Sequence, residues 1–276
     1  MAQRPKYILP PPSDTPPETV DLIHDDQLVI RWMPGTGKRL VVSFTGVERK
    51  YGGEPSREFG HVASHRGRNN VAFVTDMTRG YFSAAGMMAR IADCLQGLMA
   101  REGLGDVRSI GNSMGGTGAI LLARDLPVVA VGSFVPAMSL SAVMTAYRVW
   151  DDYQDILGPE RAESLVPILE GRPQTQFYLF YGDGTGDDRR QMRLVPDLPN
   201  VHLWVYRGER HRVTSRLKDE GTLSNIAHAM LYDDLPTLTD LMAKMPPVIR
   251  LAGGAGYERN PAFMPDKALE EDDDDV

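Results

Sequence analysis

The chain of 276 residues has a single cysteine, Cys94, so it can form no internal disulfide bond. No stretch reaches the ~18 apolar residues of a membrane-spanning helix, and the N-terminus has no apolar segment of signal-peptide length. No His, Cys and Asp cluster has metal-ligand spacing, and no glycine-rich dinucleotide fingerprint is present. These absences predict a cytoplasmic protein that contacts no membrane and needs neither a metal nor an organic cofactor.

The chain has fewer basic residues than acidic ones, 30 Lys and Arg against 37 Asp and Glu, so its net charge is −7. Six of the acidic residues form the run from Glu270 to Asp275, and without them the rest of the chain carries a net charge of −1. A nearly neutral body without a basic patch is not typical of nucleic-acid binding. We therefore expect a small-molecule substrate and no nucleic-acid partner. The sequence does not indicate an oligomeric state.

The chain divides into three parts by composition. Residues 1–20 are rich in proline and predict an extended arm, residues 21–250 predict one folded domain, and residues 251–276 predict a flexible acidic tail. Within the domain, residues 137–175 separate two predicted strands and form a helical insertion. This insertion is either a lid over an active site or a pair of packing helices.

Apolar strand-like runs alternate with helical patterns through the domain. Residues 27–33 and 39–45 predict an antiparallel hairpin, and further strands are predicted near residues 71–75, 107–110, 128–131, 177–181 and 201–206. Near-continuous apolar strands separated by helices are typical of a parallel sheet covered on both faces. The predicted fold class is therefore α/β, with a mostly parallel central sheet, helices on both faces and an antiparallel N-terminal hairpin.

The most informative motif is G-x-S-x-G at residues 111–115, with Ser113 at its centre. It lies between the predicted strand at 107–110 and a helical pattern at 117–124. A serine in a tight strand-to-helix turn has an exposed hydroxyl, and glycine neighbours permit the strained backbone. The alternative is a glycine-rich turn with an incidental serine. The context favours Ser113 as a nucleophile.

A serine nucleophile requires a base and a carboxylate that orients the base. His211 follows the strand at 201–206, so it projects from the same sheet edge as Ser113 and is the predicted base. The loop after the strand at 177–181 offers three carboxylates. We favour Asp188, with Asp183 as the second choice, although Asp187 and Asp188 have an alternative role in capping a helix near residue 189.

The order Ser113, Asp at 183–188, then His211, together with the serine turn, resembles the α/β-hydrolase superfamily over about residues 27–245. The resemblance implies that the backbone N–H of Met114 is one oxyanion donor. It also implies a second donor from the loop after the strand at 39–45, where Gly46 or Val47 is expected in place of a His-Gly-Gly-Gly motif.

The predicted function is an esterase-like serine hydrolase that cleaves an ester-like acyl bond through an acyl-serine intermediate. Two alternatives remain open. One is an acyltransferase or thioesterase that uses the same residues, and the other is a non-catalytic binding protein that keeps the fold.

The acidic tail gives a first testable prediction. A block of like charges repels itself and buries no apolar surface, so nothing offsets the entropy cost of ordering it. Deleting residues 268–276 should leave kcat/KM and Tm nearly unchanged and raise the isoelectric point. A Tm lower by several degrees, or a large fall in activity on small esters, would show that the tail folds onto the domain.

Overall fold

A computed structural model describes residues 18–47, 56–140, 164–245, 248–254 and 256–257. These residues form a sheet of nine strands in the order β1-β2-β4-β3-β5-β6-β7-β8-β9. The strands are β1 (Val20–His24), β2 (Leu28–Met33), β3 (Arg39–Phe44), β4 (Asn70–Asp76), β5 (Asp106–Asn112), β6 (Val128–Phe134), β7 (Gln176–Gly182), β8 (Val201–Tyr206) and β9 (Val248–Leu251). Strands β3 to β8 are parallel to one another, and the outer pairs β1–β2, β2–β4 and β8–β9 are antiparallel.

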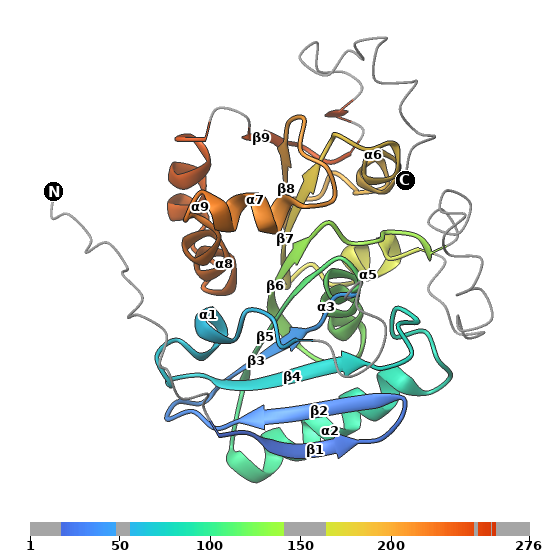
Figure 1. Cartoon of the computed structure of the whole chain (residues 1–276), viewed down its shortest axis with the longest axis vertical. Coiled ribbons are helices and arrows are strands. Elements are labelled where there is room, and N and C mark those ends of the chain that lie inside the picture. The colour runs from blue at the N-terminus through green and yellow to red at the C-terminus, as the bar shows by residue number, and fades with distance from the viewer. Residues whose placement is uncertain (1–17, 48–55, 141–163, 246–247, 255, 258–276) are drawn as a thin grey trace, which may run out of the picture.

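Helices cover both faces of the sheet (Figure 1). On one face lie α1 (Gly60–Ser64), α7 (Val213–Asp219), α8 (Leu223–Leu231) and α9 (Leu235–Met242). On the other lie α2 (Met87–Glu102), α3 (Met114–Asp125), α5 (Val166–Gly171) and α6 (Gly186–Arg193). Because both faces are covered, the central strands are buried along nearly their whole length. The predicted fold class is confirmed.

The N-terminal antiparallel hairpin consists of β1 and β2 rather than of residues 27–33 and 39–45. That predicted pairing is wrong, because β4 lies between β2 and β3. The turn at 34–38 bonds to the residues that lead into β4: Gly35 N–H donates to the Asn70 side chain at 3.1 Å, and Gly37 N–H donates to the Arg68 carbonyl at 2.7 Å. A β-carbon on Gly35 would lie 2.2 Å from the Asn69 carbonyl oxygen, so this approach requires glycine. The turn therefore directs β3 past β4 instead of back along β2.

The last predicted strand is the one at residues 201–206, so β9 is a strand that the sequence pattern did not predict. This strand has four residues and alternates between buried and partly exposed positions at the antiparallel edge beside β8. So short a pattern is a weak signal. Three predicted segments lie outside the described residues: the arm at 1–17, the tail at 258–276 and most of the insertion, residues 141–163. The structure therefore does not test whether the insertion is a lid or a pair of packing helices.

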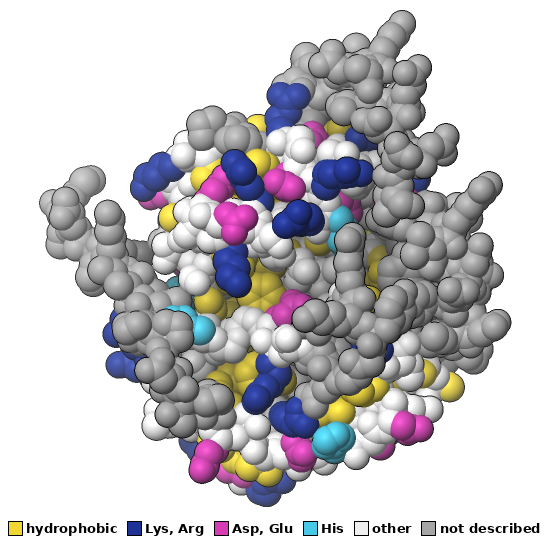
Figure 2. Space-filling model, in the orientation of Figure 1, with side chains coloured by type: hydrophobic (Ala, Val, Ile, Leu, Met, Phe, Trp, Pro, Cys, Tyr) yellow, Lys and Arg dark blue, Asp and Glu magenta, His cyan; other side chains and the backbone are white. Residues whose placement is uncertain are grey.

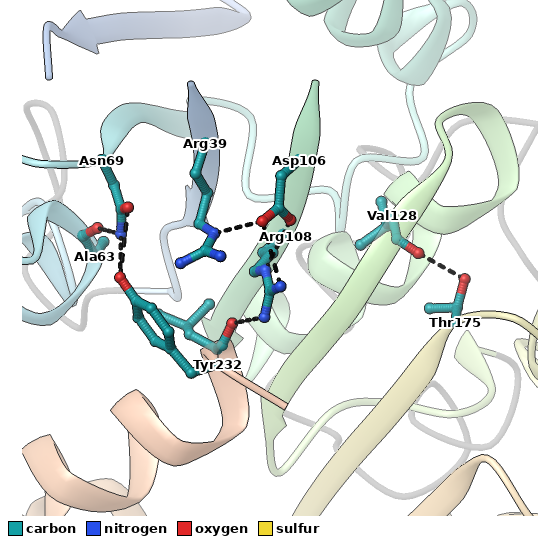
Figure 3. Close-up of polar contacts among 9 residues, drawn as sticks. Arg39, Ala63, Asn69, Asp106, Arg108, Val128, Thr175 and Tyr232 are labelled. Atoms are coloured by element: carbon teal, nitrogen blue, oxygen red, sulfur yellow. Dashed lines mark hydrogen bonds and ion pairs between the residues drawn. The ribbon is translucent and has the colours of Figure 1, made fainter. Parts of the chain in front are cut away.

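Polar side chains form hydrogen bonds and ion pairs at the amino edge of the sheet, where β3, β4 and β5 begin (Figure 3). Asp106 accepts hydrogen bonds from Arg39 Nε at 2.7 Å and from Arg108 Nε at 2.8 Å. Arg108 also donates to the Leu231 carbonyl at the end of α8. The Arg39–Asp106 ion pair connects β3 to β5, and the hydrogen bond from Arg108 connects β5 to α8 on one face of the sheet. The functional residues predicted from the sequence belong to the opposite, carboxyl edge.

The imidazole of His202 in β8 makes the stability of the fold sensitive to acid. His202 as a whole residue is 5% exposed, Nε2 bonds to Gln176 Oε1 at 3.0 Å, and Nδ1 accepts from Arg250 at 3.0 Å. Burial, with the nearby Arg250 charge, lowers the pKa of His202 from 6.5 to about 4, although Asp233 opposes the shift. The unfolded chain therefore binds more protons than the folded chain between these two values.

We expect the free energy of unfolding to fall as pH decreases from about 6.5 to about 4, as measured by urea denaturation. His202→Gln cannot be protonated, so its unfolding free energy should depend less steeply on pH across this window. Equal pH dependence in the two proteins would show that His202 does not contribute.

Candidate active site

Ser113 occupies the turn between β5 and α3 in a strained backbone conformation, with φ 56° and ψ −121°. Its N–H donates to the Phe134 carbonyl at 2.8 Å, and its carbonyl accepts from Thr117 N–H at 3.1 Å as the helix begins. Ser113 is the N-cap residue of α3, but its hydroxyl does not cap the helix. The hydroxyl is therefore available to other partners. A non-glycine residue held at such φ and ψ values is strained, and strain of this kind concentrates at functional sites.

Glycines around Ser113 are required by close backbone packing. A β-carbon on Gly111 would lie 2.1 Å from the Gly115 carbonyl oxygen, and one on Gly115 would lie 2.3 Å from the Phe44 carbonyl oxygen. A β-carbon on Gly116 would lie 2.7 Å from Ser133 Oγ. Gly111 and Gly115 of the motif, together with Gly116, thus let the turn and the start of α3 pack against β3 and β6.

Gly115→Ala should destabilise the protein by about 2–3 kcal/mol or more, because the methyl group clashes with backbone that cannot move independently. Gly97→Ala is the matched control, since Gly97 lies inside α2 and a β-carbon added there would have no atom within 4 Å. That change should raise stability by up to about 1 kcal/mol, as alanine favours helix. Urea denaturation of both variants tests the pair, and equal stabilities would contradict the packing argument.

His211 lies in the loop after β8, immediately before α7, and its ring contacts Ser113. His211 Nε2 is 2.8 Å from Ser113 Oγ, although the two residues are 98 positions apart in the sequence. The His211 side chain is 41% exposed. The ring therefore lies between a buried strand end and solvent, where it can exchange a proton with Ser113.

Asp188, in the first turn of α6, lies on the other side of the imidazole. Its Oδ1 is 2.7 Å from His211 Nδ1, and its side chain is 5% exposed. The loops after β7 and β8 approach closely because two glycines have no side chain: a β-carbon on Gly182 would lie 2.1 Å from the Glu209 carbonyl oxygen, and one on Gly184 would lie 2.8 Å from that of Gly208. This approach brings Ser113, His211 and Asp188 into one hydrogen-bonded chain.

The other carboxylates of this loop have different contacts. The Asp183 carboxylate accepts from the Gly208 N–H, and burial raises the pKa of that carboxyl group against the effect of this hydrogen bond. Asp187 pairs with Arg190 on the surface of α6. The helix cap is neither aspartate, because Thr185 Oγ1 accepts from Asp188 N–H at 3.2 Å. Of the three candidates, the structure brings only Asp188 to His211.

The two predicted oxyanion donors differ in their surroundings. Met114 begins α3 directly after Ser113, so its N–H lies among the unpaired N–H groups of a helix N-terminus. The N–H of Gly46, in contrast, donates to Oε1 of Glu58 at 3.2 Å. The donor that the sequence suggested at Gly46 is thus occupied by a carboxyl oxygen.

Tyr81, which the sequence did not indicate as a site residue, lies in the loop after β4 and makes a side-chain hydrogen bond to Ser113. Tyr81 is 6% exposed. Its position after a central strand is the only signal in the sequence, and many loop residues share it. Of the other histidines, His65 and His228 contact each other at 3.3 Å, and His202 packs against Tyr178.

The surface in Figure 2 shows Lys and Arg side chains interspersed with Asp and Glu around a central group of hydrophobic side chains. The described residues contain no group of three or more His, Cys, Asp or Glu side chains placed to hold a metal ion. In the same part of the chain, no helix combines the length and the apolar character needed to cross a bilayer.

No protein-family model matches the chain, and no curated protein matches it by sequence. Solved structures share its fold. The capsule O-acetyltransferase of Neisseria meningitidis serogroup A superposes with a TM-score of 0.52 at 14% identity, over 73% of this chain and 92% of that chain. The esterase Pf2001 of Pyrococcus furiosus has a TM-score of 0.51 at 15% identity, over 83% and 98% of the two chains.

A chain of the Gap123 glycosylation-associated protein complex of Streptococcus agalactiae has a TM-score of 0.54 at 17% identity, over 75% of this chain and 45% of that chain. With the strand order and the turn after β5, these similarities identify the fold as the α/β-hydrolase fold.

Proposed function

We propose that this protein is a serine hydrolase that cleaves an ester-like acyl bond of a small-molecule substrate. The observation that supports this most directly is the hydrogen-bonded chain from Asp188 through His211 to Ser113, with Ser113 in a strained turn at the carboxyl edge of the sheet. Carboxylate, imidazole and hydroxyl in this order activate a serine for attack on a carbonyl carbon.

In the acylation step, His211 Nε2 takes the proton of Ser113 Oγ while Oγ bonds to the carbonyl carbon of the substrate. The carbonyl electron pair moves to its oxygen, and the resulting oxyanion accepts a hydrogen bond from the Met114 N–H. Asp188 stabilises the imidazolium through Nδ1. The proton on Nε2 then passes to the departing alcohol oxygen as the acyl–oxygen bond breaks.

Water completes the reaction by attacking the acyl carbon while His211 Nε2 accepts its proton. That proton then passes to Ser113 Oγ as the acyl–Oγ bond breaks, which releases the carboxylic acid and restores the serine. The 41% exposure of the His211 side chain favours this role for water, because solvent reaches the ring. The same chemistry with an alcohol in place of water is acyl transfer. The structural similarity to an O-acetyltransferase keeps this alternative relevant, although the shared feature is the fold.

A fluorophosphonate probe tests the proposal. It should label the wild-type protein at Ser113, and p-nitrophenyl esters of increasing acyl length should be hydrolysed with a preference for one length. Absence of both labelling and turnover would leave the non-catalytic binding protein as the better interpretation. Adding an alcohol acceptor separates the two reactions, because an acyltransferase would form a new ester faster than free acid.

A further inference from the structure

A tetrahedral oxyanion usually requires two hydrogen-bond donors, and the structure places a candidate for the second donor outside the loop after β3. The Gly46 N–H is engaged by Glu58 Oε1 at 3.2 Å. A carboxyl group at this position competes for the donor, and its negative charge would oppose an oxyanion formed beside it. A donor other than the Gly46 N–H is therefore needed near Ser113, and the two candidates are the Val47 N–H of the same loop and a group from a neighbouring loop.

Tyr81 meets this requirement. Its hydroxyl hydrogen-bonds to the Ser113 side chain, so it lies next to the atom that attacks the carbonyl carbon. The oxyanion forms one carbon atom away from Oγ, within reach of the same hydroxyl. Burial raises the pKa of Tyr81 above its ordinary value; the hydrogen bond with Ser113 opposes this shift and the Asp188 charge adds to it. The hydroxyl therefore keeps its proton and can donate.

Asp76, at the end of β4, accepts hydrogen bonds from the turn that contains Tyr81 and so stabilises it. The carboxylate of Asp76 is 0% exposed and accepts hydrogen bonds from Thr78 N–H at 2.9 Å, Thr78 Oγ1 at 2.6 Å and Phe82 N–H at 2.8 Å. Tyr81 and Phe82 have φ values of 56° and 59°, which non-glycine residues seldom adopt. Strain at two consecutive residues, held by a buried carboxylate, indicates a turn built to present a side chain.

Phe82, the residue after Tyr81, packs this turn against the helix that follows Ser113. The Phe82 ring meets the Phe44 ring edge-on at a centroid distance of 5.1 Å, and a β-carbon on Gly118 of α3 would lie 2.6 Å from ring atoms of both. The same helix begins at Ser113 and Met114. Phe82 thus sets the position of Tyr81 relative to the nucleophile through direct packing on α3.

We propose that the Tyr81 hydroxyl is the second oxyanion donor beside the Met114 N–H; this assignment rests on the acyl-serine mechanism proposed above. When Ser113 Oγ bonds to the carbonyl carbon and its proton moves to His211, the carbonyl electron pair moves onto the oxygen. The Tyr81 hydroxyl then donates to that oxygen without transferring its proton, and returns to Ser113 Oγ when the product leaves.

The test compares Tyr81→Phe with Tyr178→Phe, which removes a hydroxyl that hydrogen-bonds to Asp233 instead of Ser113. Loss of an oxyanion donor lowers kcat by about 10²–10³-fold. We expect this loss in Tyr81→Phe with KM little changed, and neither effect in Tyr178→Phe. Each kcat is calculated from the concentration of active protein, which is the protein whose Ser113 reacts with a fluorophosphonate. Poorly folded protein is therefore not counted.

A trifluoromethyl ketone provides a second measurement, because Ser113 adds to it and forms a stable oxyanion. Its inhibition constant should rise about 100-fold in Tyr81→Phe and stay unchanged in Tyr178→Phe. An unchanged inhibition constant in Tyr81→Phe would overturn the assignment and restrict Tyr81 to contacting the resting serine. A higher kcat in Glu58→Ala with an unaffected Tyr81→Phe would overturn it in favour of the Gly46 N–H.

Failure of the mechanism itself has a different signature. In that case the wild-type protein neither reacts with the fluorophosphonate nor binds the ketone, and the role of Tyr81 is overturned with it. If the wild type does both and Tyr81→Phe behaves like the wild type, only the Tyr81 assignment fails.

Discussion

Ser113→Ala should abolish ester hydrolysis, with kcat falling on the order of 10⁶-fold, as when the nucleophile of a serine protease is removed. Without Oγ, no acyl-enzyme can form and His211 has no hydroxyl to deprotonate. The substitution deletes one oxygen atom from a turn whose hydroxyl makes no helix-capping contact, so Tm should remain close to that of the wild type. Steady-state kinetics and thermal melting measure the two quantities.

Ser133→Ala is the matched control. Ser133 lies on β6 beside Gly116, and its buried Oγ makes no hydrogen bond among the described residues. This variant should keep nearly full activity and fluorophosphonate labelling, whereas Ser113→Ala should lose both. Substantial residual activity in purified Ser113→Ala would remove Ser113 from the role of nucleophile.

Asp188→Asn should give the second largest effect, a fall in kcat of about 10⁴-fold, the loss known for the equivalent change in a serine protease. The amide keeps the size of the carboxylate, so packing in the first turn of α6 is preserved. It cannot stabilise the imidazolium, and its NH₂ group presented to Nδ1 favours the wrong tautomer of His211. Labelling by the fluorophosphonate should slow in parallel with kcat.

The neighbouring acids serve as controls for this experiment. Asp187→Asn and Asp183→Asn should have modest effects on kcat, because Asp187 pairs with Arg190 and Asp183 bonds to the Gly208 N–H. If Asp183→Asn alone collapsed the rate, the mechanism would stand with a different acid. Near wild-type rates in all three variants would indicate a Ser113–His211 dyad or a carboxylate from elsewhere in the chain.

Local sequence was enough to predict the serine turn and the fold class. Gly111 and Gly115 flank Ser113 between a strand and a helix, and this pattern is typical of a strained turn. The Gly111 requirement is local, because a β-carbon there would clash with Gly115. Apolar runs without polar alternation likewise indicate strands covered on both faces. Because the carboxyl ends of parallel strands lie at one edge of a sheet, the sequence also predicted that the loops containing Asp188 and His211 lie near Ser113.

Tertiary structure decided the features that depend on contacts between distant segments. Whether β2 pairs with β3 depends on hydrogen bonds from the turn at 34–38 to residues near 70, and no local preference encodes them. The contact of Asp188 with His211 follows from the backbone approach at Gly182 and Gly184, which positions two loops against each other. In the fold these glycines permit the close packing of the two loops.

Tyr81 and Glu58 show the same limit within the site. Each lies in a loop, with no motif around it, and each becomes relevant only because the strand order places β3 between β4 and β5. A hydroxyl 32 positions from Ser113 reaches it because Phe82 packs on Gly118. Sequence patterns report the backbone geometry of neighbouring residues, while the side chains that meet across a sheet edge are set by packing over the whole domain.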